Sequence, residues 1–304
     1  MKTVLISGAG SGMGLMTAQT LIREGYAVYA GVRDPLTRNA SRREALESYA
    51  REHNGFVHVV DMDIHSEESC VAAVGRVIDN HGRLDVVIHN AAHLFIGMSE
   101  AFTPEQLADS FNTNAIGAHR LNRAALPHMR QRGEGVLVYV GSAITRIVAP
   151  FMMPYVAGKY ALDAIAESTA YEVHTHGVET VIVMPGIFLD GTSHFATAVY
   201  PADEQVASNY ESAHSEFERY EPGLRQMFRN DGNAPVQGVG DEIARVLRLP
   251  RGEKPMRTSV DYSDYGADAV NAVADAQTRR VFEIMGFDRL LSVSTPDDQA
   301  TGEK

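Results

Sequence analysis

The sequence predicts an α/β fold in which a doubly wound parallel sheet carries helices on both faces. Two observations lead to this prediction: short runs rich in Val, Ile and Leu alternate with longer segments of helical periodicity, and those runs are nearly continuously apolar. A strand with apolar side chains on both sides is typical of a sheet covered by helices on both faces. The β-α-β-α order implies crossover connections and hence parallel strands.

Six strands with intervening helices are expected, and a seventh segment near the end has strand character. The strands are expected at 3–6, 27–30, 56–60, 85–88, 136–140, 178–183 and 256–260. The helices are expected at 12–24, 42–51, 66–80, 104–129, 155–174, 237–249 and 264–286. Residues 190–233 are polar and interrupt this rhythm, so we expect a helical excursion or lid there. No linker divides the chain, which predicts one domain over 1–291 and a frayed tail over 292–304.

Composition excludes several classes of protein. The chain has 304 residues, of which 44% are hydrophobic and 22% charged, and this balance excludes disorder and fibrous repeats. Its net charge of −12 repels phosphate backbones and anionic lipids, so we expect no nucleic-acid partner. The single cysteine, Cys70, fits a reducing compartment, which predicts a cytoplasmic protein. Because no apolar run reaches eighteen residues, we expect neither a membrane span nor a signal peptide.

A glycine-rich turn joins the first strand to the first helix. It reads Ser-Gly-Ala-Gly-Ser-Gly-Met-Gly over residues 7–14. A helix N-terminus favours an anion, and glycines let a pyrophosphate approach the backbone. The glycine spacing is that of positions 8, 12 and 14, because Met13 stands where the usual dinucleotide fingerprint has its third glycine. The alternative is a turn without a ligand. The residues expected to bind a dinucleotide here are Gly8, Ser11, Gly12, Met13 and Gly14.

The end of the second strand favours NADP over NAD. An acidic residue that binds the ribose 2′-hydroxyl of NAD is expected there, but Val32 occupies the place. Arg33 follows at once, and further arginines at 38, 42 and 43 offer donors to a 2′-phosphate. The alternative is a set of solvated surface arginines, with Asp34 pairing with Arg33. Asp63, with Ile64 beside it, follows the third strand and can accept from an adenine amine or cap a helix.

Tyr155 and Lys159 form a candidate acid/base pair. They lie four residues apart at the start of a predicted helix, so they share one face. A neighbouring ammonium stabilises a phenolate, which favours proton exchange by the tyrosine. Chance produces this spacing on many helices, and the alternative is an amphipathic surface. Ser142 ends the strand over 136–140, at the sheet edge where α/β proteins bind ligands, and can donate to a carbonyl oxygen.

Together these motifs resemble the single-domain branch of the short-chain dehydrogenases/reductases, which have a Rossmann-like fold, over nearly the whole chain. The glycine loop, the segment His-Asn-Ala-Ala at 89–92, Asn114, and the spacing of Ser142, Tyr155 and Lys159 carry the resemblance. The second-strand segment 28–34 is locally similar to hydroxysteroid and retinol dehydrogenases, many of which use NADP.

This resemblance implies hydride transfer between a nicotinamide and a carbonyl or secondary alcohol. Tyr155 would pass the proton, Ser142 would hold the oxygen, Lys159 would also bind the nicotinamide ribose, and Asn114 would anchor a water. Further cofactor contacts are expected at Asn90, Ala91, Pro185, Gly186, Phe188 and Thr192. The family also implies a homodimer or homotetramer formed through its two longest helices.

Four positions depart from the family's pattern. His89 and Ala92 replace an asparagine and a glycine, and Gly158 replaces the serine that commonly precedes the lysine. Asp190 stands where a threonine usually bonds the nicotinamide carboxamide, with Thr192 two residues on. None of the first three removes a catalytic group, and an aspartate at 190 can still accept a hydrogen bond from the carboxamide amine.

The residues near these motifs favour a hydrophobic or aromatic ketone as substrate, because an apolar wall satisfies few hydroxyls. The candidates for the substrate wall are His93, Phe95, Met153, Phe188 and His194, and the alternative for each is a plain core position. The histidines have no carboxylate or cysteine at a recognised ligand spacing, so no metal is expected.

Two rival functions remain open from the sequence. A dinucleotide-binding redox sensor would bind cofactor without turnover, but such relatives typically lack the tyrosine. An epimerase or dehydratase would retain and recycle its cofactor, whereas a dehydrogenase exchanges it.

Overall fold

The computed structural model describes residues 1–229 and 234–294. Its centre is one seven-stranded sheet in the order β3-β2-β1-β4-β5-β6-β7, and every pairing is parallel. The strands are β1 (Thr3–Ser7), β2 (Ala27–Val32), β3 (Phe56–Asp61), β4 (Val86–His89), β5 (Gly135–Val140), β6 (Val178–Pro185) and β7 (Arg257–Val260). The reversal of order between β1 and β4 confirms the expected doubly wound α/β fold.

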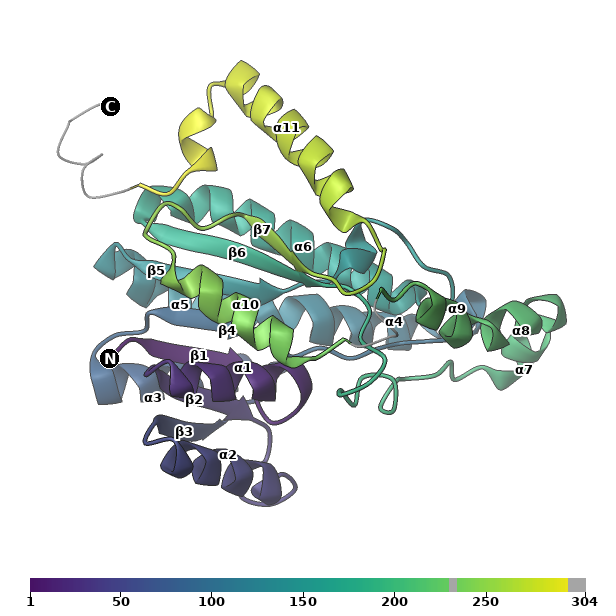
Figure 1. The fold of residues 1–304 in the computed structure, drawn as a ribbon, viewed down its shortest axis with the longest axis horizontal. Helices are drawn as coiled ribbons and strands as arrows, with labels where there is room; N and C mark the ends of the chain where they lie inside the picture. The colour runs from purple at the N-terminus through teal and green to yellow at the C-terminus, as the bar shows by residue number, and fades with distance from the viewer. Residues whose placement is uncertain (230–233, 295–304) are drawn as a thin grey trace.

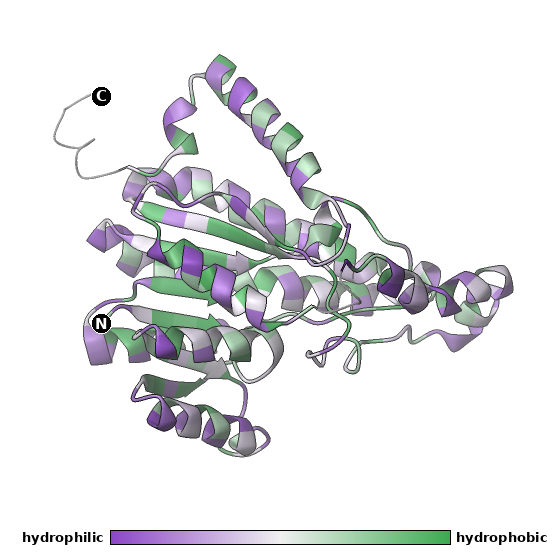
Figure 2. Ribbon diagram, viewed as in Figure 1, coloured by the Kyte–Doolittle hydropathy of each residue, from purple (hydrophilic) through white to green (hydrophobic). Residues whose placement is uncertain are grey.

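Helices cover both faces of this sheet (Figure 1). One face carries α1 (Gly12–Arg23), α2 (Ala40–Glu52) and α10 (Gln237–Arg248), and the other carries α3 (Glu67–His81), α5 (Gly117–Arg132) and α6 (Met153–Val173). Successive strand side chains point to opposite faces, so each strand supplies both layers. The strands are accordingly mostly hydrophobic, whereas the helices carry both kinds of residue (Figure 2).

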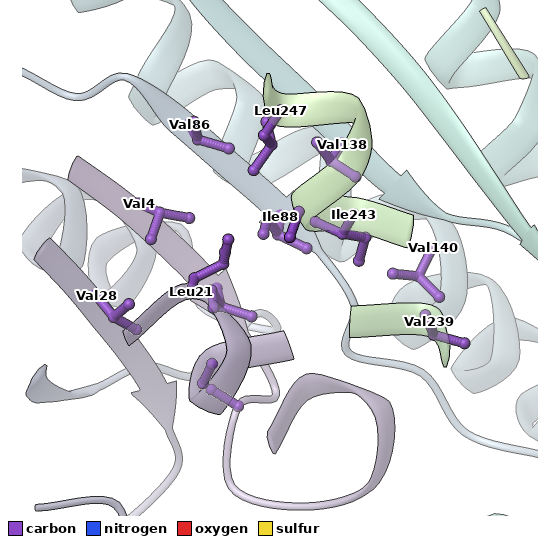
Figure 3. Close-up of a cluster of buried hydrophobic side chains, with 14 of the residues drawn as sticks. Val4, Leu21, Val28, Val86, Ile88, Val138, Val140, Val239, Ile243 and Leu247 are labelled. Carbon is purple, nitrogen blue, oxygen red and sulfur yellow. The ribbon is translucent and has the colours of Figure 1, made fainter. Parts of the chain in front are cut away.

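Hydrophobic side chains of the sheet, α1 and α10 form one buried cluster (Figure 3). Val4 and Ile88 from the strands, Leu21 from α1, and Val239 and Ile243 from α10 are all fully buried in one cluster. Because α1 begins at the glycine turn, this packing fixes where the helix points its N-terminus.

The expected helix over 104–129 is wrong in one respect, because it is interrupted. It consists of α4 (Pro104–Phe111), a π-helical turn over Asn112–Ile116, and α5. A capping box of Thr103 and Gln106 starts α4, and in the π-helical turn the Gly117 N–H donates to Asn112 O, five residues back. Such wide turns are frequently found at functional sites.

Between β6 and α10 the chain leaves the sheet for a helical excursion. Its helices are α7 (Glu204–Ser208), α8 (Glu211–Glu218) and α9 (Tyr220–Gln226), which extend beyond the carboxyl ends of the strands (Figure 1). Phe217 and Tyr220 attach it to a buried cluster that includes Met152 and Tyr155. Residues 230–233 of the expected excursion lie outside the described residues.

After β7, helix α11 (Ala267–Met285) and a short 3₁₀ turn, Asp288–Leu291, complete the described chain. Val293 is buried, and the Ser294 N–H donates to His174 O over 2.9 Å. Residues 295–304 of the expected tail lie outside the described residues. Among the helices that are described, none combines the length and the apolar character needed to cross a membrane.

Candidate active site

A cavity of about 620 Å³ opens at the carboxyl ends of the strands. It is lined by residues from the loops after β1 to β6 and by the excursion, so segments far apart in sequence meet there. Carboxyl ends of parallel strands are where α/β sheets bind ligands. The sequence-predicted residues that line this one cavity are Gly8, Ser11, Gly12, Met13, Arg33, Asp63, Ile64, Asn90, Ala91, His93, Ser142, Tyr155, Lys159, Pro185, Gly186, Phe188, Thr192 and His194.

The glycines of the first loop have two different tasks. A Cβ on Gly14 would lie 2.4 Å from Gly8 O and from Asn90 Nδ2, and one on Gly8 would lie 3.0 Å from Ala91 Cα. These two glycines therefore admit the loop after β4, and Gly14 does not line the cavity. Asn90 Nδ2 donates to the main-chain oxygens of Ser7 (3.0 Å) and Gly8 (3.2 Å), which ties the two loops together.

The N-terminus of α1 faces the cavity, and no side chain of its first turn occupies its N–H groups. Gly12 has φ +53°, and the nearest atom to a Cβ there would be 3.8 Å away, on Thr192. The first turn of α1 has no acidic residue, and the Ser11 side chain forms no capping hydrogen bond. The free N–H groups and helix dipole of such a terminus favour an anion.

Arginine side chains contribute to the lining of the cavity beyond the end of β2. Besides Arg33, both Arg38 and Arg42 line it, and none of the three forms an ion pair with a carboxylate of the described chain. Arg43 differs, because it pairs with Glu47 at 2.7 Å. Three exposed guanidinium groups thus remain available to an anionic group.

Ser142, Tyr155 and Lys159 all line the cavity, and the last two are buried. Lys159 is 3% exposed, and its Nζ donates to Val140 O at 2.8 Å and lies 5.9 Å from the centre of the Tyr155 ring. Burial lowers the pKa of Lys159 to about 8. Burial also raises the pKa of Tyr155 to about 12, although a hydrogen bond with Ser142 acts in the opposite direction. In the protein without ligand, the effect of burial on the pKa of Tyr155 is therefore larger than the stabilisation of its phenolate by Lys159 that the sequence led us to expect.

Asn114 does not line the cavity but fixes part of its wall. It is buried in the π-helical turn, where its Oδ1 accepts from the His93 N–H (2.8 Å) and its Nδ2 donates to His93 O (3.0 Å). Both main-chain polar groups of His93 are thus held by one side chain. The wide turn is what brings this amide inward between α4 and α5.

Two expected wall residues lie elsewhere, which corrects the sequence-based assignment. Phe95 is fully buried and packs against Phe102, with ring centres 6.2 Å apart, so it is a core residue. Met153 also lies off the cavity, and its neighbour Met152 lines it instead. The one-residue difference follows from the helix start, because adjacent residues on a helix face different directions.

Asp190 is turned away from the cavity. It pairs with Arg225 at 3.2 Å, and its side chain is 80% exposed. Thr192 lines the cavity, so the nearby hydroxyl and not the carboxylate is placed to reach a ligand.

The excursion adds wall residues that sequence reasoning missed, namely Tyr220 and Leu224, and Tyr265 joins them from the segment after β7. The Tyr220 hydroxyl donates to Met152 Sδ at 2.8 Å. His194 packs edge-to-face on Tyr155, with ring centres 5.4 Å apart, and burial with the Lys159 charge lowers the pKa of His194 to about 4. Of these residues only Tyr220 has a signal in the sequence, as an aromatic residue within the polar segment 190–233.

Acidic, histidine and cysteine side chains do not gather in groups of three or more that could hold a metal ion anywhere in residues 1–229 and 234–294. His174, for example, interacts through Nδ1 with Leu290 O at 2.9 Å.

Comparison with known proteins identifies relatives over most of the chain. Residues 2–199 match the family described as short chain dehydrogenase. A 3-ketodihydrosphingosine reductase of Bacteroides thetaiotaomicron is 32% identical over 190 residues, which are 62% of this chain and 65% of that protein. Human retinol dehydrogenase 8 is 30% identical over 266 residues, or 86% of this chain and 83% of that protein. Human 17-beta-hydroxysteroid dehydrogenase type 1 is 30% identical over 252 residues, or 82% and 74%.

Solved structures share the fold. A short-chain dehydrogenase from Streptomyces avermitilis superposes with a TM-score of 0.71 at 23% identity, covering 94% of this chain and 98% of that chain. An alcohol dehydrogenase from the archaeon Thermococcus sibiricus, solved with 5-hydroxy-NADP, gives 0.68 at 20% identity, covering 87% and 97%. An NAD⁺-bound xylitol dehydrogenase gives 0.57 at 25% identity, covering 61% and 70%.

Proposed function

The chain belongs to the short-chain dehydrogenase family, whose members are NAD(P)-dependent oxidoreductases. From this premise we propose that the protein interconverts a lipophilic ketone and its secondary alcohol, with NADP as the preferred cofactor. The observation that carries the proposal is that Ser142, Tyr155 and Lys159 line the same cavity as the glycine loop. A redox sensor would have no need of this set.

Ser142, Tyr155 and Lys159 have complementary roles in this reaction. When bound, the reduced nicotinamide supplies the hydride to the carbonyl carbon. The Tyr155 hydroxyl donates its proton to the carbonyl oxygen, and because its pKa is near 12 the phenol is protonated at neutral pH. Ser142 donates a hydrogen bond to the same oxygen. Lys159 places a positive charge near the phenol, which favours the phenolate that remains after transfer.

The residues present fit a phosphorylated dinucleotide. The N-terminus of α1 would hold the pyrophosphate, because it offers N–H groups and has no acidic neighbour in its first turn. Arg33, Arg38 and Arg42 would hold a 2′-phosphate, which explains why arginines without acidic partners line the cavity. Because both cofactors contain the pyrophosphate, it is the arginines that support NADP over NAD.

The substrate end supports a lipophilic compound. Its wall includes Ile144, Met152, Phe195, Val199 and Leu224, which offer few hydrogen bonds to a polyol. The names of the relatives, which refer to retinol, a hydroxysteroid and a ketosphingoid, are those of lipid alcohols and ketones.

The test is the oxidation of NADPH and NADH with a panel of steroidal, aromatic and long-chain aliphatic ketones. We expect turnover with NADPH that is lost in Tyr155→Phe. Turnover absent from every pair, with cofactor still raising the melting temperature, would favour the sensor; no stabilisation by either cofactor would refute the assigned cofactor site.

The prediction of cofactor choice has a matched control at the neighbouring residue, Arg43. Arg38→Ala/Arg42→Ala should raise the KM for NADPH at least about tenfold, since hydrogen bonds to a charged phosphate are lost, and leave the KM for NADH unchanged. Arg43→Ala, which removes a guanidinium already paired with Glu47, should change neither. Equal effects on the two cofactors would exclude a 2′-phosphate contact.

We also infer that copies of the chain associate through α5, α6 and the π-helical turn. Ile116 and Tyr160 are 42% and 41% exposed there, and small residues such as Ala161 allow close helix packing. Sedimentation equilibrium should give a dimer or tetramer, and Ala161→Glu should reduce it to monomer.

A further inference from the structure

A buried serine outside the cavity connects the two elements that carry the proposed catalytic residues. Ser110, in the last turn of α4, is fully buried. Its Oγ donates to Pro154 O at 2.7 Å and accepts from Asn114 Nδ2 at 3.1 Å. Pro154 immediately precedes Tyr155 on α6, and Asn114 holds the main chain of His93 at the cavity wall. One hydroxyl therefore bonds both to the start of α6 and to the amide of the π-helical turn.

Gly158 makes this arrangement possible. A Cβ at that position would lie 3.0 Å from Asn114 Cβ and 3.1 Å from Ser110 Oγ. Such distances are tighter than ordinary packing, so α6 approaches the π-helical turn this closely because residue 158 has no side chain. The volume that a side chain at 158 would use is already occupied by the Ser110 hydroxyl.

Without this hydroxyl, Asn114 would lose one of its three hydrogen bonds. One N–H of its buried amide would then have no partner, which favours rotation or displacement of the side chain. The pair of hydrogen bonds to His93 depends on that orientation, and so does the wall beside Tyr155. The start of α6 would lose its only side-chain link to α4 among the described hydrogen bonds.

We propose that Ser110 is a positioning residue for the reaction, whose hydroxyl orients Asn114 and anchors the start of α6, and that Gly158 provides the space for it. The proposal rests on the proposed function for its effect on catalysis, whereas its effect on Asn114 is independent of any activity.

The experiment moves the serine hydroxyl from position 110 on α4 to position 158 on α6. Ser110→Ala should lower kcat about tenfold, the scale of a small misplacement of reacting groups, with KM for the ketone changed less than about twofold. In Ser110→Ala/Gly158→Ser the new hydroxyl enters the space vacated by the old one, and we expect most of kcat to return. Ser110→Ala/Gly158→Ala is the matched control, because it adds the same Cβ without a hydroxyl and should not recover.

Hydrogen exchange supplies a readout that needs no substrate. The His93 N–H should exchange several-fold faster in Ser110→Ala and in the Ala/Ala control, and recover in the Ala/Ser variant, if Asn114 has lost and regained its orientation. Equal kcat in the two double variants would refute the proposal, as would unchanged exchange at His93 in Ser110→Ala. Absence of turnover in the wild-type protein would instead refute the proposed function, and the exchange data would still decide whether Ser110 orients Asn114.

Discussion

His89 should make the protein lose stability as the pH falls, and the size of the effect can be worked out. His89 ends β4, is 4% exposed, and stacks on Tyr139 with ring centres 4.4 Å apart. Neither of its ring nitrogens has a hydrogen-bond partner in the described part of the chain. Burial lowers the pKa of His89 to about 3, against a smaller opposing effect of the nearby Asn122 side chain. The folded protein therefore keeps this imidazole neutral where the unfolded chain, with a pKa near 6.5, takes up a proton.

The sign follows from which state binds the proton. Between pH 6.5 and about 3 only the unfolded state is protonated at this site, so acidification favours unfolding. Each pH unit in that window is worth about 1.4 kcal/mol. Between pH 7.5 and pH 5 the free energy of unfolding should therefore fall by about 2 kcal/mol because of His89 alone.

The assay compares urea unfolding of the wild type and His89→Asn at both pH values. Far-UV circular dichroism is the suitable signal, since the chain contains no tryptophan. His89→Asn changes packing against Tyr139, so the test is the difference between the two pH values and not the stability at either one. The variant should lose about 2 kcal/mol less than the wild type on acidification. His119→Asn, on the exposed side of α5, should behave as the wild type. Parallel losses in wild type and His89→Asn would refute the reasoning.

Three further outcomes are expected. Because burial lowers the pKa of Lys159 to about 8, the rate of carbonyl reduction should fall as the pH rises above about 8. The residual rate of Lys159→Met should not fall in this way. If the pH–rate profile of that variant kept its alkaline limb, the fall could not be assigned to Lys159. Arg257→Met should lower the free energy of unfolding by about 2 to 3 kcal/mol in urea titrations, because it removes the guanidinium shared by Asp163 and Glu167 while Arg146 still pairs with Asp163; a loss below about 1 kcal/mol would mean that the carboxylates rehydrate. Ile243→Ala should cost about 2 to 5 kcal/mol in the core of Figure 3, and cofactor affinity should stay within about twofold if α1 keeps its direction.

The sequence predicted the parts of the site that lie at strand ends. The glycine loop, Asn90 and Ser142 each follow an apolar run, and the carboxyl ends of parallel strands meet at one edge. These residues can therefore be predicted to lie together although they are far apart in the sequence. The pairing of Tyr155 and Lys159 was equally predictable, because a spacing of four residues places two side chains on one helical face whatever the tertiary structure is.

Side-chain direction beyond a strand end was not predictable in the same way. Phe95 and His93 are two residues apart, yet one is a core residue and the other lines the cavity, because the loop after β4 is shaped by Asn90 and Asn114. Asp190 is directed away from the cavity because Arg225, thirty-five residues later in the excursion, pairs with it, whereas Thr192 lines the cavity as expected. Both outcomes depend on contacts that no local pattern contains.

The interrupted helix shows why a departure from the family's pattern, here Gly158 in place of a serine, can depend on a second residue elsewhere in the chain. Helical periodicity over 104–129 is compatible with one continuous helix, since a single extra residue shifts the phase of an apolar stripe by about 100°, which is no more than the width of the stripe itself. Asn114 lies in this wide turn and faces α6, where a Cβ at residue 158 would lie only 3.0 Å from Asn114 Cβ while the Ser110 hydroxyl occupies the space beside it. The hydroxyl missing at 158 is present at Ser110, in the turn just before the interruption, within hydrogen-bond reach of Asn114. The π-helical turn, Ser110 and Gly158 are thus one structural feature distributed over three places in the sequence, and substitutions among them should be coupled and not additive.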